Sequence, residues 1–87
     1  MNLFDNMNVT PYNNKNQPHG YWEQYHSNGN LWYKGNHKDG KCDGYWEAYH
    51  INGNLMYKGY FINGKRDGYW EYYYDNGELE FKEYYIN

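Results

Sequence analysis

The sequence predicts an all-β fold, a single twisted antiparallel meander of stacked 24-residue β-hairpin repeats. The first observation is this fixed period, which is typical of repeat architectures. The second is that Asn-Gly or Asp-Gly dipeptides, the strongest short-range hairpin signals, recur between the periodic segments. The third is the frequent glycine, which disfavours a stable helix. The repeated motif Gly-Tyr-Trp-Glu occupies residues 20–23, 44–47 and 68–71.

The period divides the chain into a cap and three repeats. We predict an N-terminal cap with a degenerate half-repeat at 1–19, repeat 1 at 20–43, repeat 2 at 44–67, and repeat 3 with a C-terminal cap at 68–87. Pro11 and Pro18 remove backbone donors from the cap, which suits the edge of a sheet. Counted with this half-repeat, the array is expected to contain about seven strands.

Composition explains how so short a chain can fold. A conventional closed core is marginal at 87 residues, but stacked repeats bury their surface against their neighbours. Aromatic residues make up 24% of the chain, with 14 Tyr and 4 Trp, so rings must supply most of the apolar contact. The lone Cys42 excludes an internal disulfide and fits a reducing compartment. Because residues 1–6 lack a signal-peptide pattern and no apolar run approaches ~20 residues, we expect a cytoplasmic protein.

The first turn of each repeat predicts which residues face each other. A two-residue loop at Asn52-Gly53 would be a type I′ turn. The resulting register pairs Tyr49 with Met56, Ala48 with Tyr57, Glu47 with Lys58 and Trp46 with Gly59. The same register in the other repeats pairs Glu23 with Lys34, Trp22 with Gly35 and Glu71 with Lys82. Opposite charges recur at one position three times, which supports the register and predicts three cross-strand ion pairs.

The second turn, Asp39-Gly40 or Asn63-Gly64, predicts the next strand pairing. With Asn63-Gly64 as the loop, the register pairs Gly59 with Gly68, Lys58 with Tyr69 and Tyr57 with Trp70. Paired glycines let two backbones approach closely, so we expect the sheet to curl along this line.

Strand alternation separates two faces. The face of Trp22, Trp46 and Trp70 is the predicted core, and the other face is wetter and rich in tyrosine. Rigid aromatic side chains are favoured at binding surfaces, although the same rings would also simply cover a thin sheet. The predicted ligand- or partner-binding residues are Tyr21, Tyr25, Trp32, Lys34, Tyr45, Tyr49, Met56, Lys58, Tyr69 and Tyr73.

The groups that could carry chemistry favour a structural interpretation. His26 and His50 occupy equivalent positions two strands apart, roughly 10 Å, which is too far for both to bind one metal ion. Cys42 has only His37 as a candidate activating base. The recurring glutamates have lysine partners, so we predict no catalytic residue, no metal site, no cofactor and no enzymatic activity.

Taken together, these motifs carry a family resemblance. The order Gly-Tyr-Trp-Glu, Tyr, Asn-Gly-x-Leu, Lys-Gly and Asn-Gly-Lys-x-Asp-Gly over residues 20–87 resembles the MORN repeat in its bacterial variant form. The resemblance implies an elongated, twisted β-meander used for protein–protein contact, dimerisation or phospholipid binding. Some bacterial relatives are described as antitoxin-like, which implies an immunity role. The family has no common catalytic residues.

We therefore expect a non-catalytic binding protein whose partner is another protein, engaged through the aromatic face or a sheet edge. The alternative is sequestration of a small anionic ligand such as a nucleotide signal, held by lysines beside the rings. The net charge of −3 and the absence of a basic stripe argue against duplex nucleic acid and against attachment to a membrane surface. Self-association stays open, because Tyr84, Tyr85 and Ile86 end the chain with apolar bulk.

Overall fold

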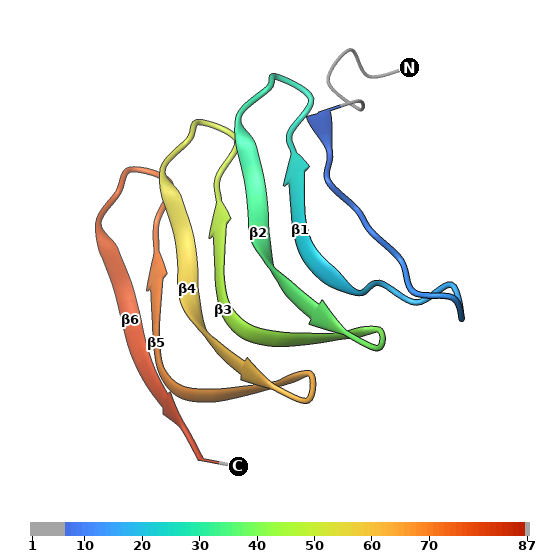
Figure 1. Ribbon diagram of the computed structural model, residues 1–87. Helices are drawn as coiled ribbons and strands as arrows, with labels where there is room; N and C mark the ends of the chain where they lie inside the picture. Colours follow the sequence, from blue (N-terminus) through green and yellow to red (C-terminus); the bar gives the residue numbers. More distant parts are fainter. Residues whose placement is uncertain (1–6, 87) are drawn as a thin grey trace.

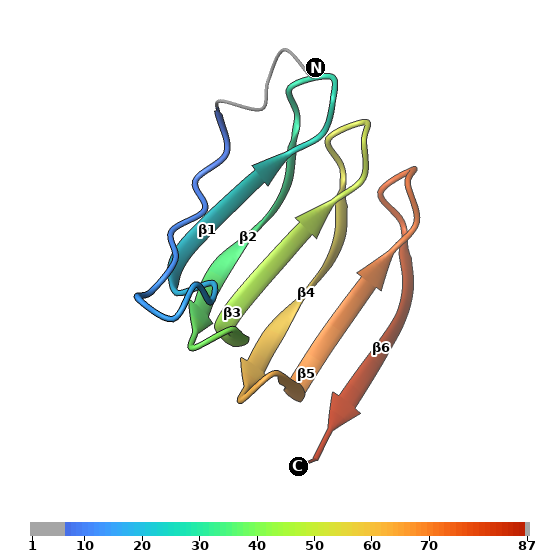
Figure 2. The same cartoon turned by 90° about the vertical axis from the view of Figure 1, so that its right-hand side faces the viewer.

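The computed structural model describes residues 7–86 and confirms the all-β prediction. Six antiparallel strands form one open sheet in sequence order, and residues 7–86 contain no α-helix. The strands are β1 (Gly20–Tyr25), β2 (Leu31–Lys38), β3 (Lys41–Tyr49), β4 (Leu55–Ile62), β5 (Lys65–Tyr73) and β6 (Leu79–Tyr85). They lie side by side in a single layer (Figures 1 and 2). The principal extents are 37 × 33 × 13 Å, and residues 7–86 place no second layer over either face of the sheet.

The prediction of about seven strands is wrong by one within the described residues. The N-terminal segment 7–19 makes only isolated bridges, between Val9 and Glu23 and between Tyr12 and Pro18. Pro11 and Pro18 lack the backbone N–H that a continuous ladder needs, so the segment cannot pair along its whole length. The predicted cap also includes residues 1–6, which lie outside the described part of the chain. The prediction that no signal peptide is present concerns the same six residues.

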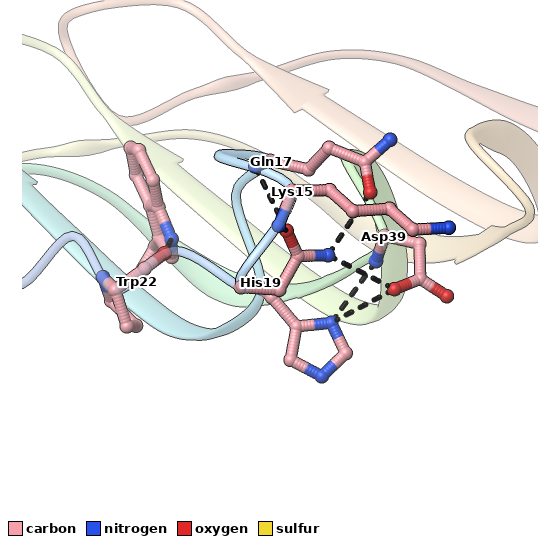
Figure 3. Close-up of polar contacts among 7 residues, drawn as sticks. Lys15, Gln17, His19, Trp22 and Asp39 are labelled. Atoms are coloured by element: carbon pink, nitrogen blue, oxygen red, sulfur yellow. Dashed lines mark hydrogen bonds and ion pairs between the residues drawn. The ribbon is translucent and has the colours of Figure 1, made fainter.

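The N-terminal segment is nevertheless fastened to repeat 1 (Figure 3). Val9 and Glu23 exchange two backbone hydrogen bonds of 2.9 Å. Indole Nε1 of Trp22 donates to the carbonyl O of Pro11 at 2.8 Å, and Nδ1 of His19 lies 3.5 Å from Oδ1 of Asp39 in the β2–β3 turn. The segment therefore covers the edge of β1 that faces away from β2.

The Asn-Gly turns differ from the expected two-residue loops. In the β3–β4 hairpin, Gly53 N donates to His50 O at 2.9 Å, and His50 N donates to Asn54 O at 2.8 Å. Gly53 has a φ of +94°, whereas Asn52 has no positive φ. This geometry is a three-residue loop that ends in a glycine bulge. Tyr49 consequently faces Leu55 rather than the predicted Met56. A second bulge, between Ala48 and Tyr49 with Met56 as the extra residue on β4, then returns the strands to the predicted register.

The register beyond that bulge is confirmed in all three hairpins. Trp46 faces Gly59, Glu47 faces Lys58 and Ala48 faces Tyr57. The predicted neighbours Glu23 and Lys34, Trp22 and Gly35, and Glu71 and Lys82 also face each other.

The second pair of turns is confirmed, but the strand pairing that follows them is not. Asn63 and Gly64 have φ values of 51° and 80°, as a type I′ turn requires. The ladder holds as far as Tyr60 and Asp67 and then shifts, so that Lys58 faces Glu71 and Tyr57 faces Tyr72. The predicted pairs of Gly59 with Gly68, Lys58 with Tyr69 and Tyr57 with Trp70 are therefore wrong.

Gly68 is the physical reason for this shift. Its φ of +71° bends β5, so that three residues, 68–70, stand opposite the single residue Gly59. Gly44 bends β3 in the same way, with a φ of +87°. Figure 1 shows both strands curving near their first residues. The sheet does curl at the glycines, as predicted, but it does so through irregularities and not through facing glycine pairs.

The core is a row of tryptophans on one face, which we call the tryptophan face. Trp22, Trp46 and Trp70 are 6%, 4% and 0% exposed. A Cβ atom added to Gly35 would overlap the indole of Trp46, and one added to Gly59 would overlap that of Trp70. Trp22 faces Gly35 in the ladder, as predicted, but the indole that lies over Gly35 is the one from the next repeat. Trp46 and Trp70 thus each pack their repeat against the preceding one.

Polar side chains tie consecutive hairpins together along one end of the sheet. Asn28 and Asn30 both donate from Nδ2 to the carbonyl O of Ile51, at 2.8 and 2.9 Å. Asn52 and Asn54 repeat this arrangement on the carbonyl O of Asp75, at 2.7 and 2.9 Å.

The equivalent histidines join the same system of lateral bonds. Nε2 of His26 lies 2.8 Å from Tyr49 O, and Nε2 of His50 lies 2.9 Å from Tyr73 O. Both imidazoles are half-buried and bridge neighbouring repeats, which supports the structural interpretation of these two histidines.

Candidate functional site

The wetter face carries the same arrangement of two tyrosines and a glutamate in every repeat, which we call the tyrosine–glutamate clamp. In repeat 2, the hydroxyl of Tyr45 donates to Oε2 of Glu47 and that of Tyr49 donates to Oε1, both at 2.8 Å. The residues lie at alternate positions of β3, so they share one face. The equivalent clamps are Tyr21–Glu23–Tyr25, at 2.7 and 2.9 Å, and Tyr69–Glu71–Tyr73, at 2.7 and 2.6 Å.

A lysine from the preceding repeat completes two of the clamps. Nζ of Lys34 lies 3.3 Å from Oε1 of Glu47, and Nζ of Lys58 lies 3.4 Å from Oε1 of Glu71. The sequence-based prediction assigned each glutamate to the lysine of its own hairpin. Those residues do face each other, but the ammonium groups of Lys34 and Lys58 turn to the following repeat, because the shifted ladder brings its glutamate alongside.

The clamps shift the pKa values of their members in opposite directions. Hydrogen bonds from the two phenols hold the pKa of Glu23 below its ordinary value of 4.5. Burial alone would raise the pKa of Glu47, but the hydrogen bonds from its two tyrosines and from Lys34 outweigh burial and lower it. Burial and the hydrogen bond to Glu23 raise the pKa of Tyr21 to about 12. The clamps therefore hold neutral phenols against a carboxylate, which fixes the orientation of each ring.

Between repeats 2 and 3 the clamped face is hollowed. A depression of about 320 Å³ lies there, lined by Tyr45, Lys58, Gly59, Tyr60, Asp67, Gly68 and Tyr69. The rings of Tyr45 and Tyr60 meet with their centroids 5.2 Å apart and form one wall. Asn36 occupies the position of Tyr60 in repeat 1, so that repeat cannot form the same wall.

Eight of the ten predicted binding residues belong to the clamps and their lysines. They are Tyr21, Tyr25, Lys34, Tyr45, Tyr49, Lys58, Tyr69 and Tyr73. The other two are set apart, since Trp32 stacks on His26 with centroids 5.3 Å apart and Met56 is half-buried on β4. Sequence reasoning missed Tyr60 and Asp67 as members of the hollow. The sequence did contain one signal for the hollow, because the position that holds Asn36 in repeat 1 holds the aromatic Tyr60 in repeat 2.

The tryptophan face has its own polar feature at the C-terminal end. The guanidinium carbon of Arg66 lies 5.4, 5.9 and 5.6 Å from the ring centroids of Trp70, Tyr72 and Tyr85. A shallow hollow of about 440 Å³ beside it is lined by Phe61, Gly64, Lys65, Arg66 and Tyr85. Lys65 and Arg66 thus place two cations beside aromatic rings at this end of the face.

The cysteine and its neighbouring histidine are poorly suited to nucleophilic chemistry. Sγ of Cys42 lies 4.0 Å from Nε2 of His37. Burial raises the pKa of the Cys42 thiol and lowers the pKa of His37, so the neutral thiol and neutral imidazole are both favoured. His37 lies edge-on between Trp22 and Trp46, with centroids 4.8 and 5.0 Å away. Within residues 7–86 no group of three or more His, Cys, Asp or Glu could hold a metal ion.

A single-layer sheet of tandem hairpins, with lateral bonds repeated from unit to unit, defines a β-hairpin repeat protein of the MORN type. Residues 18–39, 43–63 and 66–87 match the MORN repeat variant, and the chain belongs to this family. MORN repeats are generally modules that bind membranes or proteins, and the family is generally non-enzymatic.

The other comparisons give no further relatives. Neither a curated protein nor a solved structure matches the chain. Among residues 7–86 there is no helix of the length and apolar character that crossing a bilayer requires.

Proposed function

We propose that the protein is a binding module that holds a partner protein on its clamped tyrosine face, centred on the hollow between repeats 2 and 3. The observation that carries this proposal is the clamp itself. Tyr45 and Tyr69 are 40% and 44% exposed, yet both hydroxyls are bound to glutamates. Rings held in this way lose little side-chain entropy when a partner covers them.

The hollow supports an anchored mode of binding. Its apolar walls come from tyrosines, and Gly68, where an added Cβ atom would meet nothing within 4 Å, leaves room for a partner side chain beside the backbone. Binding energy at protein interfaces concentrates where an aromatic or arginine side chain enters such a pocket. A toxin as the partner would make the protein an antitoxin-like immunity protein, which is the finer form of the same proposal.

Crosslinking followed by mutation tests the proposal. A photo-crosslinking amino acid at Tyr60, inside the hollow, is expected to capture one protein from the host extract, whereas the same group at the exposed Lys38 captures none or different ones. Calorimetry with the purified partner should then show a loss of at least roughly tenfold in affinity for Tyr45→Ala, as for an interface hot spot. Tyr74→Ala, at an exposed tyrosine outside the clamps, is the matched control. Tyr45→Phe keeps the ring but loses the bond to Glu47, so its loss of affinity should be smaller than that of Tyr45→Ala. Equal affinity of Tyr45→Ala and Tyr74→Ala would contradict the proposal.

A second candidate function is the capture of a small anionic ligand, and the position of Lys65 and Arg66 beside the rings of Phe61 and Tyr85 favours it. A nucleotide base could stack on a ring while its phosphate pairs with the cations. Melting-shift measurements with a nucleotide panel test it, with Lys65→Ala expected to abolish the shift and Lys38→Ala expected to retain it. Flotation with anionic vesicles at low salt tests membrane attachment separately, and no flotation is expected from the net charge of −3.

A further inference from the structure

The lateral bonding of the array stops at β6. Lys34 and Lys58 each reach the glutamate of the following repeat. Lys82 occupies the same position in repeat 3, has no following repeat, and forms no ion pair with any residue of the described range 7–86. β6 has only β5 beside it (Figures 1 and 2), so its outer backbone groups lack a strand partner there. Such an edge is a template for another strand.

A head-to-tail continuation of the array is blocked at this edge. Gly35 and Gly59 leave room for the tryptophan of the next repeat, and in repeat 3 the equivalent residue is Glu83. The side chain of Glu83 would occupy the space that the tryptophan indole of a further repeat needs. At the other end, β1 is already covered by the N-terminal segment through Val9. The described part of the chain therefore offers one open edge, and that edge cannot accept a further copy in the register of the repeats.

The sequence of β6 is complementary in charge to itself. It reads Leu79-Glu80-Phe81-Lys82-Glu83-Tyr84-Tyr85. If two copies of β6 run antiparallel with Phe81 opposite Phe81, then Glu80 of each copy faces Lys82 of the other. Lys82 faces Glu71 on the clamped face. Glu80 is the extra residue of the bulge opposite Tyr72 and Tyr73, and alternation from Lys82 through Phe81 places it on the same face as Lys82. A register centred on Glu80 or on Lys82 would instead set like charges opposite, which is destabilising.

We propose that two copies of this chain join edge to edge through antiparallel β6 strands centred on Phe81, which gives Lys82 the carboxylate that it lacks. The apolar side chains at the edge support this: Phe81, Tyr84 and Ile86 are 42%, 71% and 90% exposed. Phe81 stacks on Tyr72 with centroids 4.4 Å apart, so two adjacent Phe81 rings would extend this stack across the junction. The two-fold axis is perpendicular to the sheet, so the assembly closes as a dimer and presents both clamped faces on the same side.

Charge reversal tests the proposal. Sedimentation of the wild-type chain over a concentration series is expected to show a reversible monomer–dimer equilibrium. Lys82→Glu replaces two attractive pairs with two repulsive ones and should weaken dimerisation roughly tenfold or more. Glu80→Lys should do the same, and the double change Glu80→Lys with Lys82→Glu should restore dimerisation because the pairs are only exchanged. Lys38→Glu, the same change at an exposed position on β2, is the control.

A crosslinking experiment tests the register. With Cys42 changed to Ser, Phe81→Cys places two thiols directly opposite across the two-fold axis, within the Cα separation that a disulfide requires. Oxidation should give a covalent dimer in high yield, whereas Glu83→Cys at the same edge should give little. Near-ultraviolet circular dichroism of the tryptophans confirms that each variant is folded. A wild-type chain that stays monomeric at every soluble concentration, a charge-swapped double variant no better than either single one, or equal disulfide yields at 81 and 83 would overturn the proposal.

Discussion

The indole of Trp70 lies over Gly59, a residue of the preceding repeat, and its Nε1 donates to the carbonyl O of Tyr60 at 3.1 Å. Trp46 stands in the same relation to Gly35 and donates to Asn36 O at 3.0 Å. A single-layer sheet has no opposing layer against which to bury its rings, so burial depends on this close approach of a ring to bare backbone. The contact between tryptophan and glycine is therefore the main apolar link from one repeat to the next.

The first prediction concerns this contact. Gly59→Ala places a methyl group inside the Trp70 indole and is expected to destabilise the fold by about 1–3 kcal/mol, the usual cost of overpacking. Gly68→Ala is the matched control, because a Cβ there meets nothing within 4 Å and the cost comes only from a φ of +71°. Urea unfolding followed by tryptophan fluorescence measures both. Because a positive φ alone costs Ala about 1–2 kcal/mol, the decisive value is that of Gly59→Ala itself, whose φ is not positive. A loss well below about 1 kcal/mol for Gly59→Ala would show that the ring moves aside freely.

The sequence predicted the fold class and the hairpin register because both depend on local patterns. Period-two alternation places Tyr45, Glu47 and Tyr49 on one face whatever the exact turn, so the clamped face could be found. The turn types could not be separated, because Asn52-Gly53 and Asn63-Gly64 are the same dipeptide in loops of different length. The dipeptide shows that a turn exists, and the neighbouring hydrogen bonds decide which one forms.

The hollow was beyond sequence reasoning for a related reason. It depends on the bend at Gly68 and on the shift that brings Lys58 opposite Glu71 instead of Tyr69. The turn dipeptide does not predict a shift of this kind, since it arises inside β5, where the positive φ of Gly68 bends the strand. The same shift explains why the ion pairs link neighbouring repeats and not the two strands of one hairpin.

The second prediction tests the bonds between hairpins. Asn52 accepts a hydrogen bond at Oδ1 from Asn54 N at 3.0 Å and donates from Nδ2 to Asp75 O. Asn76 occupies the equivalent position and accepts the same local bond from Glu78 N at 2.9 Å, but has no following hairpin to reach. Asn52→Ala should therefore cost about 0.5–1.5 kcal/mol more than Asn76→Ala, the usual net contribution of one hydrogen bond. Equal costs in thermal or urea unfolding would mean that the lateral bond adds nothing to stability.

The third prediction is an acid dependence that comes from the clamps. The pKa of Glu47 is lowered in the folded protein, so its contribution to stability is present above its ordinary value of 4.5 and is lost as the pH falls through the lower, folded value. Tyr49→Phe removes the donor at 2.8 Å from Oε1 and should raise the pKa of Glu47 toward 4.5. Carboxyl chemical shifts in an NMR titration measure this change. Tyr74→Phe, outside the clamps, should leave it unaltered, and an unchanged Glu47 titration in Tyr49→Phe would mean that the phenol does not hold the carboxylate.

The last prediction is the alkaline counterpart. The hydrogen bond to Glu71 and burial raise the pKa of Tyr69 to about 12, and burial together with the bond to Glu47 raises that of Tyr49 to about 12. A raised folded pKa means that the contribution to stability is complete below the ordinary value of 10.0 and is lost as the pH rises through about 12. Unfolding by base should therefore begin above pH 10 and accompany phenolate formation, followed by ultraviolet absorbance. Glu71→Gln removes the negative charge beside Tyr69 and should let that phenol ionise at lower pH, whereas Glu78→Gln, in the exposed β5–β6 loop, should not. If the two variants gave the same phenolate titration, the raised pKa would owe nothing to the carboxylate, and the clamp could not be what orients the ring.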